Sequence, residues 1–268
     1  MNLSSHQQRL ATSLVLMPCI IWLIFQQDII MGTALFVVSI LGLYEYCTMF
    51  WKGRKKITSL AQGAGMAAII SLCIGPHTLH LAPLGLGLVF IFMALIFLKN
   101  YSVSPSDASF TDATLLLAGI IYLPLLLQLF RFLSPIEILF VFVSAFATDT
   151  GGFYAGCLWG KKKIWPQISP KKTWIGSLGG MLLTTILCLS MGIIWGKAPW
   201  WMFALLGILL NISAQLGDFF ESALKRWAGV KDSGHLLPGH GGIMDRIDSL
   251  LFALPVYYLA ASLHTFFY

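Results

Sequence analysis

Long runs of apolar residues follow one another along most of the chain, and they constrain its fold more than any other feature. Inside a bilayer every backbone N–H and C=O group must be paired within the protein, so only helices and closed barrels can cross it. A spanning helix needs about 20 mainly apolar residues. The runs lack the alternation of apolar and polar residues that is typical of barrel strands. The sequence therefore predicts an all-α, polytopic transmembrane helix bundle.

About nine spans can be delimited by this length criterion. They cover residues 10–26, 29–50, 57–74, 79–98, 113–133, 136–158, 175–195, 200–222 and 243–266. The first run resembles a secretory signal peptide, but no small-residue cleavage site follows its apolar core, so we expect an uncleaved helix. With 57% hydrophobic and only 10% charged residues, the chain has too little charge to cover a soluble globule.

The basic residues predict how the bundle is oriented. With nine spans, 15 of the 17 Lys and Arg residues fall at the N-terminus or in the even-numbered loops, and only Arg131 and Lys197 fall on the other side. An excess of Lys and Arg marks the cytoplasmic face, so we expect a cytoplasmic N-terminus and an external C-terminus. The net charge of +6 mostly reflects this topology. It also attracts the anionic lipid headgroups at the cytoplasmic surface. A nucleic-acid partner is not needed to explain it.

The positions of the acidic residues are the most informative functional feature. Ionisable residues in membrane helices are costly and usually mark an ion, proton or substrate site. Five of them lie in or beside the sixth, eighth and ninth spans, near the expected cytoplasmic ends: Asp149, Asp218, Glu221, Asp245 and Asp248. The eighth span also places Asn211, Gln215, Asp218 and Ser222 on one helical face. We expect this polar stripe to point into the bundle.

Neighbouring carboxylates repel one another unless cations neutralise them. Mg²⁺ suits oxygen ligands and typically takes one or two carboxylates together with water and substrate phosphates. Two neighbouring cations could brace the attacking and leaving oxygens of a phosphoryl-type transfer. The structural alternative is that the acids only pair with basic residues to hold the helix ends together, namely Lys225, Arg226, Lys231 and Arg246.

A basic, proline-bent and aromatic loop joins the sixth and seventh spans. Its lysines at 161–163 are explained by the positive-inside rule, but residues 169–173 (SPKKT) combine lysines with hydroxyls and a fixed turn, which suits a triphosphate. Glycine pairs follow Asp149 and residue 240. Glycines allow close backbone approach to a ligand, but each pair could equally be a turn or a helix-packing site.

Residues 222–226 (SALKR) and 231–248 (KDSGHLLPGHGGIMDRID) resemble the signature of the phosphatidate cytidylyltransferase, or CDP-diacylglycerol synthase, family. Residues 149–156 and 169–176 resemble further segments of the same family. Ile175 departs from the family pattern, in which a polar residue is expected there, and this puts any contact made by that side chain in doubt. The resemblance is close from Asp149 onward. Before it, only the hydrophobic helix pattern and Glu45 between two tyrosines fit.

The resemblance implies that phosphatidate and CTP give CDP-diacylglycerol and pyrophosphate, with Mg²⁺ as cofactor, in a homodimer embedded in membrane lipid, in the cytoplasmic membrane of a bacterium. It implies N-terminal transmembrane helices in residues 1–110 and a catalytic region in residues 111–268. The expected catalytic residues are Asp218, Lys225, Arg226, Asp245 and Asp248, and the expected metal ligands are Asp149, Asp218, Glu221 and Asp245. The expected nucleotide-binding residues are Ser169, Lys171, Lys172, Lys231, Asp232, His240, Gly241 and Gly242.

Two other classes of membrane protein remain open. A transporter or ion channel would also place a carboxylate cation site in a helix bundle, usually near the midplane and often in repeated halves, and neither feature is found. A CTP-dependent lipid kinase or a CDP-alcohol phosphotransferase would use similar groups, but the Asp-Gly-x-x-Ala-Arg run expected of the phosphotransferase is missing. The acyl-chain preference and the choice between one and two cations stay undetermined.

Overall fold

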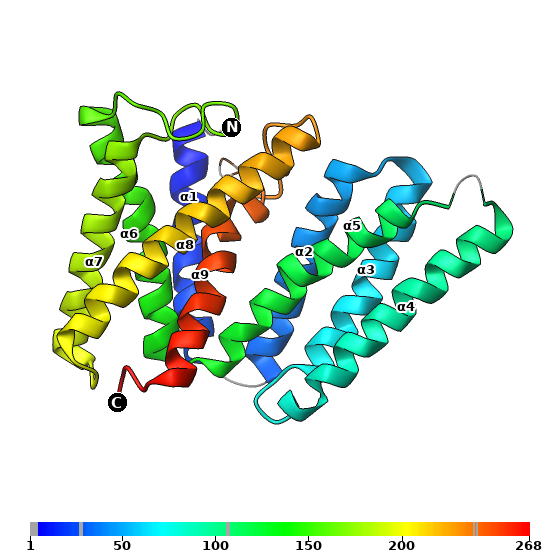
Figure 1. Ribbon diagram of the computed structural model, residues 1–268, viewed down its shortest axis with the longest axis horizontal. Helices are drawn as coiled ribbons and strands as arrows, with labels where there is room; N and C mark the ends of the chain where they lie inside the picture. The colour runs from blue at the N-terminus through cyan, green and yellow to red at the C-terminus, as the bar shows by residue number, and fades with distance from the viewer. Residues whose placement is uncertain (1–4, 27–28, 106–107, 238, 240) are drawn as a thin grey trace. The chain divides into compact units, whose positions relative to one another are not determined.

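The computed structural model describes residues 5–26, 29–105, 108–237, 239 and 241–268. These residues form helices and no strand (Figure 1), which confirms the all-α prediction. The α-helices are α1 (Ser5–Ile24), α2 (Ile29–Phe50), α3 (Gly53–Cys73), α4 (Ala82–Val103), α5 (Phe110–Ile120), α6 (Pro135–Trp159), α7 (Trp174–Trp195), α8 (Trp200–Trp227) and α9 (Met244–Leu263).

Eight helical segments of the described residues are long and apolar enough to cross a membrane, which confirms an integral membrane protein. They correspond to the second to ninth predicted spans. Helix α1 coincides with the first predicted span but is not among the eight. A ninth crossing therefore stays a prediction, as does the orientation that depends on it.

The described chain forms two compact units. Unit 1 comprises Met1–Phe132 together with Ser233–Ile243, and unit 2 comprises Leu133–Asp232 together with Met244–Tyr268. The chain thus passes from unit 2 into unit 1 and back between α8 and α9. Each unit has its own buried apolar core.

In unit 1, α3 packs between α2 and α4. The predicted span over residues 113–133 is not one regular helix, because α5 runs into a π-helical turn, Ile121–Leu125, and then a 3₁₀ turn, Gln128–Phe132. Pro124 lies inside the π turn. Proline has no N–H to donate and its ring collides with the preceding turn, so the α-helical hydrogen-bond ladder is interrupted there.

Arg131 lies within the 3₁₀ turn of this irregular segment and closes the C-terminal end of α3. Its Nη1 donates hydrogen bonds to the carbonyl oxygens of Ser71 (2.9 Å) and Ile74 (2.7 Å). The last carbonyls of a helix have no partner inside the helix and carry partial negative charge, so a guanidinium is favourable there. Arg131 is one of the two basic residues assigned to the non-cytoplasmic side, and this contact gives it a structural role.

In unit 2, α6 packs on α7, α7 on α8, and α8 on α9. The starts of two helices are capped by side chains. Ser134 and Glu137 form a capping box at α6, with the Ser134 N–H 2.7 Å from Glu137 Oε2. Thr173 Oγ1 accepts the Gly176 N–H at the start of α7. Such caps pair backbone N–H groups that the helix leaves open.

The two ends of unit 2 differ in chemistry. One end is filled by aromatic rings, with Phe140, Phe203 and Phe267 packed at centroid distances of 5.3 to 6.0 Å. Along α8, Phe203 precedes Asp218 by fifteen residues, a rise of roughly 22 Å in a helix of 1.5 Å per residue. Asp218 and the acids near it therefore lie at the opposite end of the helices from this aromatic cluster.

Candidate active site

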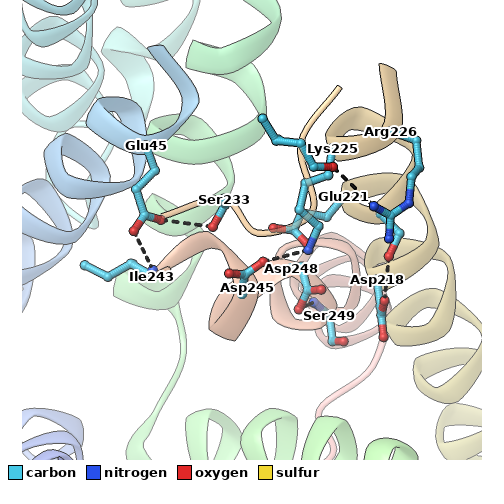
Figure 2. Close-up of polar contacts among 12 residues, drawn as sticks. Glu45, Asp218, Glu221, Lys225, Arg226, Ser233, Ile243, Asp245, Asp248 and Ser249 are labelled. Carbon is cyan, nitrogen blue, oxygen red and sulfur yellow. Dashed lines mark hydrogen bonds and ion pairs between the residues drawn. The ribbon is translucent and has the colours of Figure 1, made fainter. Parts of the chain in front are cut away.

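Three helices of unit 2 carry the five acidic residues: α6 carries Asp149, α8 carries Asp218 and Glu221, and α9 carries Asp245 and Asp248. The charges of Asp149, Asp218 and Asp248 are near enough to repel one another, and Glu221 is affected by Asp245 and Asp248 in the same way. Figure 2 shows the four acids of α8 and α9 around one another. The structure thus brings the carboxyl groups of three helices into one neighbourhood.

Lys225 links the acids of α8 to those of α9. Its ammonium forms an ion pair with Glu221, one turn earlier on α8, and lies 2.6 Å from Asp245 Oδ1 (Figure 2). Glu221 is 1% exposed, and its Oε1 accepts no hydrogen bond from the described residues. A buried charge costs several kcal/mol unless it is fully paired. A single lysine is therefore shared by two carboxylates from different helices.

A second lysine, Lys172, reaches Asp218 from the loop before α7. Its Nζ lies 2.5 Å from Asp218 Oδ2 and 4.5 Å from the centre of the Phe219 ring. Both side chains of this ion pair are about one quarter exposed, at 25% and 27%. Ion pairs that remain partly exposed contribute little to stability, so this one can exchange partners at small cost.

A cavity of about 600 Å³ opens beside this ion pair. Small-molecule sites usually have volumes of roughly 300–1,000 Å³. The charged side chains that line it are Asp149, Lys163, Lys171, Lys172 and Asp218. The cavity therefore presents carboxylates from α6 and α8 to lysines of the connecting loop.

The loop of residues 160–173 is held in a hairpin-like shape that presents these lysines. Residues 163 and 173 form an antiparallel bridge, and the Ile164 N–H donates to the Lys172 carbonyl at 3.2 Å. Trp165 packs edge-on against Phe219 of α8, with centroids 4.7 Å apart. Lys163, which the positive-inside rule explained without a site, is thereby a cavity residue that sequence reasoning missed.

Below the cavity, α6, α7 and α8 are joined by a buried hydrogen-bond network. Asn211 Nδ2 donates to Thr148 Oγ1 (3.1 Å), and Thr148 Oγ1 lies 3.0 Å from Thr184 Oγ1. Gln215 Nε2 donates to Asn211 Oδ1 at 2.6 Å and Gln215 also lines the cavity. Thr148 precedes Asp149, and Gln215 lies three residues before Asp218, so the network fixes the backbone that carries both acids.

The two glycines after Asp149 have different roles. A Cβ on Gly151 would lie 2.6 Å from the Gly179 carbonyl oxygen, and a Cβ on Gly180 would lie 2.7 Å from that of Thr148. Gly151 and Gly180 let the backbones of α6 and α7 touch. For Gly151 the structure thus favours helix packing over contact with a ligand. Gly152, in contrast, lines the cavity and would meet nothing closer than 3.6 Å. It leaves room for a ligand.

The second glycine segment belongs to unit 1. Gly239 and Gly241 have φ values of +74° and +82°, which favour glycine, and the Leu237 N–H donates to the Gly241 carbonyl at 3.0 Å. These two glycines therefore form a turn, one of the structural roles considered for this segment. Gly242 is buried, and a Cβ there would lie 2.6 Å from Glu45 Oε2. Sequence reasoning gave Glu45 no role.

The remaining predicted residues are more dispersed. Arg226 is exposed and donates to the carbonyls of Ile168 (3.5 Å) and Val230 (3.2 Å), so it ties the loop to the end of α8. Lys231 and Asp232 are exposed, and Ser169 is half-buried with its N–H bonded to the Trp165 carbonyl. The predicted residue His240 lies outside the described residues.

No three His, Cys, Asp or Glu side chains of the described part of the chain converge into a ready-made metal cage. The donor chemistry nevertheless fits a magnesium ion, which needs only one or two carboxylates and takes its other ligands from water and phosphates. Asp149 is exposed to the cavity and forms no ion pair with a described residue. It is available as an oxygen ligand together with Asp218.

Comparisons with known proteins agree with this chemistry. A model of the cytidylyltransferase family matches residues 7–264. Proteins named phosphatidate cytidylyltransferase from Staphylococcus saprophyticus, Staphylococcus haemolyticus and Staphylococcus aureus (strain COL) are 42%, 41% and 39% identical to the chain over 170 residues. The matched stretch covers 62% of this chain and 65% of each relative, somewhat less than two thirds of the relatives' length.

Proposed function

The chain belongs to the cytidylyltransferase family, and from this we propose that it transfers a cytidylyl group from CTP to phosphatidate in phospholipid synthesis, giving CDP-diacylglycerol and pyrophosphate. The observation that carries the proposal is the cavity of about 600 Å³ in which Asp149 and Asp218 face three lysines of one loop. The similar proteins from Staphylococcus are named for this activity.

The reaction needs no nucleophilic side chain. A phosphate oxygen of the lipid attacks the α-phosphorus of CTP, a new P–O bond forms, and the bond between the α- and β-phosphates breaks so that pyrophosphate leaves with its electron pair. The attacking oxygen is already ionised near neutral pH. Catalysis then depends on positioning and on neutralising charge, as in other phosphoryl-type transfers. This agrees with a site made of carboxylates and lysines.

The basic side chains have separate tasks in this proposal. Lys163, Lys171 and Lys172 neutralise the phosphates of CTP from the loop, and Lys225 supports the α8–α9 side of the site. Lys172 is available for this because its pair with Asp218 is partly exposed. Residues 169–173 hold the lysines in register through the bridge between residues 163 and 173.

Asp218 and Asp245 are the proposed magnesium ligands, with Asp149, Glu221 and Asp248 as further ligands or as partners of the ligands. A bound Mg²⁺ would polarise the phosphates and balance the negative charge that develops on pyrophosphate. The support for this assignment is the mutual proximity of the carboxylates of α6, α8 and α9.

We place the site on the cytoplasmic side of a bacterial cytoplasmic membrane, with the N-terminus inside, in a homodimer. The support for the side is the distribution of Lys and Arg. A site there would receive CTP from water while phosphatidate keeps its acyl chains in lipid.

The direct test uses membranes that contain the chain, given CTP labelled in cytosine, phosphatidate and Mg²⁺. The expected result is a lipid-soluble cytidine product formed together with an equal amount of pyrophosphate. Membranes without the chain provide the control. Movement of ions or solutes across sealed vesicles without that product would reject the proposal and favour a transporter.

A further inference from the structure

Glu45 of α2 is a buried carboxylate that the proposed chemistry does not use. It is 1% exposed and lies between Tyr44 and Tyr46 in unit 1. A carboxylate removed from water needs strong hydrogen bonds or ion pairs to remain charged. Its partners therefore show what Glu45 holds in place.

Two of these partners come from a distant segment, the loop Ser233–Ile243. The Ile243 backbone N–H donates to Glu45 Oε1 at 3.0 Å, and the Ser233 hydroxyl donates to Oε2 at 3.3 Å (Figure 2). These donors are 198 and 188 residues away from Glu45 in the sequence. Since Ser233 and Ile243 are the two ends of the loop, a single carboxylate closes it.

The glycines at both ends of the loop are shaped to this carboxylate. A Cβ on Gly234 would lie 2.4 Å from Glu45 Oε1, and a Cβ on Gly242 would lie 2.1 Å from the Ser233 hydroxyl and 2.6 Å from Glu45 Oε2. Cβ atoms do not approach polar atoms so closely, so any side chain at either position must displace Glu45 or the loop. The close approach of Glu45 thus explains why positions 234 and 242 of the segment 231–248 are glycines.

The loop is buried at its base and exposed at its tip. Ser233 is 4% exposed and Gly242 is buried, whereas His235, Leu236 and Gly239 are exposed. The chain continues from Ile243 directly to Met244 and Asp245. The backbone position that Glu45 fixes is therefore two residues away from a proposed magnesium ligand.

We propose that Glu45 is a positioning residue that fixes both ends of the Ser233–Ile243 loop, and with them the backbone of Gly241 and Gly242, which the family resemblance assigns to nucleotide binding. Its participation in turnover rests on the proposed function, but the ordering of the loop does not. Glu45 touches no reacting atom. Its effect passes through the backbone of the loop.

The first test measures hydrogen exchange of the loop amides in the purified full-length chain without substrate. Losing a hydrogen bond to a charged group should make the amides of Ser233–Ile243 exchange at least about tenfold faster in Glu45→Ala. Asp112→Asn is the matched control, because Asp112 is another hydrogen-bonded acid of unit 1. Unchanged loop exchange in a folded Glu45→Ala protein would overturn the proposal.

Graded variants separate positioning from general damage. In Glu45→Gln the amide oxygen can still accept from Ile243, and the amide N–H can donate to the Ser233 oxygen. Glu45→Gln should therefore keep the loop protected, whereas Glu45→Gln with Ser233→Ala keeps only the bond to Ile243 and should give protection between that of Glu45→Gln and that of Glu45→Ala. Gly242→Ala should also loosen the loop, and Gly87→Ala should not, because a Cβ on Gly87 meets nothing within 4 Å. A Glu45→Gln loop as unprotected as that of Glu45→Ala would contradict the bridging geometry.

Kinetics then connect the loop to catalysis. Glu45→Ala should raise KM for CTP by about tenfold or more, with a smaller change in KM for phosphatidate, and Glu45→Gln should restore most of the difference. Equal kinetics for wild type and Glu45→Ala, with a loosened loop, would reject the link to turnover. Lack of any turnover by the wild-type chain would reject the proposed function instead, while the exchange result would still stand.

Discussion

The acids of unit 1 and those of unit 2 are neutralised in different ways. In unit 1, Asp112 pairs with Lys55 and accepts a hydrogen bond from Trp51 Nε1 at 3.0 Å, and Glu45 is held by Ser233 and Ile243. Each acid has local donors that suit a permanent structural role. In unit 2, Glu137 is held in the same way by Ser134 and Tyr257, but Asp149 and the acids of α8 and α9 lie close together, and two of them share Lys225.

The difference is greatest at two positions. Neither Asp149 nor Asp248 forms an ion pair with any residue that the structure describes, although both feel the charge of Asp218. Carboxylates that lie close together repel one another, and this is unfavourable in a low-dielectric setting. Such a group indicates a binding site for positive charge, whereas the paired acids of unit 1 indicate helix ties.

Removal of divalent cations should give the largest effect on turnover. If the neighbouring carboxylates of unit 2 bind Mg²⁺, chelation with EDTA should abolish product formation and added Mg²⁺ should restore it fully. The measurement is pyrophosphate release against free Mg²⁺ concentration. Full activity in EDTA would show that the neighbouring carboxylates of unit 2 do not bind a cation that turnover needs.

The next largest effect should come from Asp218→Asn and Asp245→Asn. Each removes a proposed magnesium ligand with little change in shape, so turnover should fall by at least about 100-fold while membrane insertion is unchanged. The same change in unit 1, Asp112→Asn, should leave turnover within about twofold. Near-normal turnover in either unit 2 variant would remove that residue from the metal site.

Substitution of a lysine in each unit should change KM for CTP by different amounts, with an effect smaller than that of the aspartate variants. Lys172→Gln removes one positive charge from the cavity, so KM for CTP should rise by roughly tenfold, a loss of about 1.4 kcal/mol. Lys55→Gln removes a lysine that pairs with Asp112 and should leave KM unchanged. Initial rates at varied CTP concentration provide the comparison.

The smallest effect on chemistry should come from Gly180→Ala. Its Cβ would press on the Thr148 carbonyl of α6, so we expect a loss of about 1–3 kcal/mol in the stability of unit 2 and a lower unfolding temperature in detergent. Turnover at low temperature should be affected far less than in the aspartate variants. Gly87→Ala, which meets no atom within 4 Å, should leave the unfolding temperature unchanged.

Local patterns in the sequence were sufficient for the helices. The predicted span 29–50 coincides with α2 (Ile29–Phe50), and the predicted span 175–195 differs from α7 (Trp174–Trp195) by one residue. Apolar length determines where a membrane helix begins and ends, and both are visible in the chain. Two helices run further than predicted, because α4 ends at Val103 and α8 at Trp227, each five residues beyond the predicted span. In the span 113–133, Pro124 interrupts the helix. Its effect on the hydrogen bonds depends on packing that the pattern does not contain.

Only part of the candidate site could be predicted from local sequence patterns. Helical spacing indicated that Asn211, Gln215 and Asp218 share a face, and the structure places all three between α6 and α7 or at the cavity. The pairing of Glu45 with a loop almost 200 residues later could not be inferred, because helical periodicity carries no information about distant partners. Lys163 was missed for another reason. In the sequence, a lysine that only marks the cytoplasmic face cannot be distinguished from a lysine that also lines a ligand site.

The aromatic end of unit 2 has a consequence for energy conservation. A cell membrane stores a proton gradient, and hydrated carboxylates within a helix bundle are a hazard to it. Rings such as Phe140, Phe203 and Tyr257, packed edge-on or tilted, fill the end of unit 2 that lies away from Asp149, Asp218 and Asp248. We therefore expect water to reach these acids from one end of the helices only, which would keep the bundle from conducting protons across the membrane.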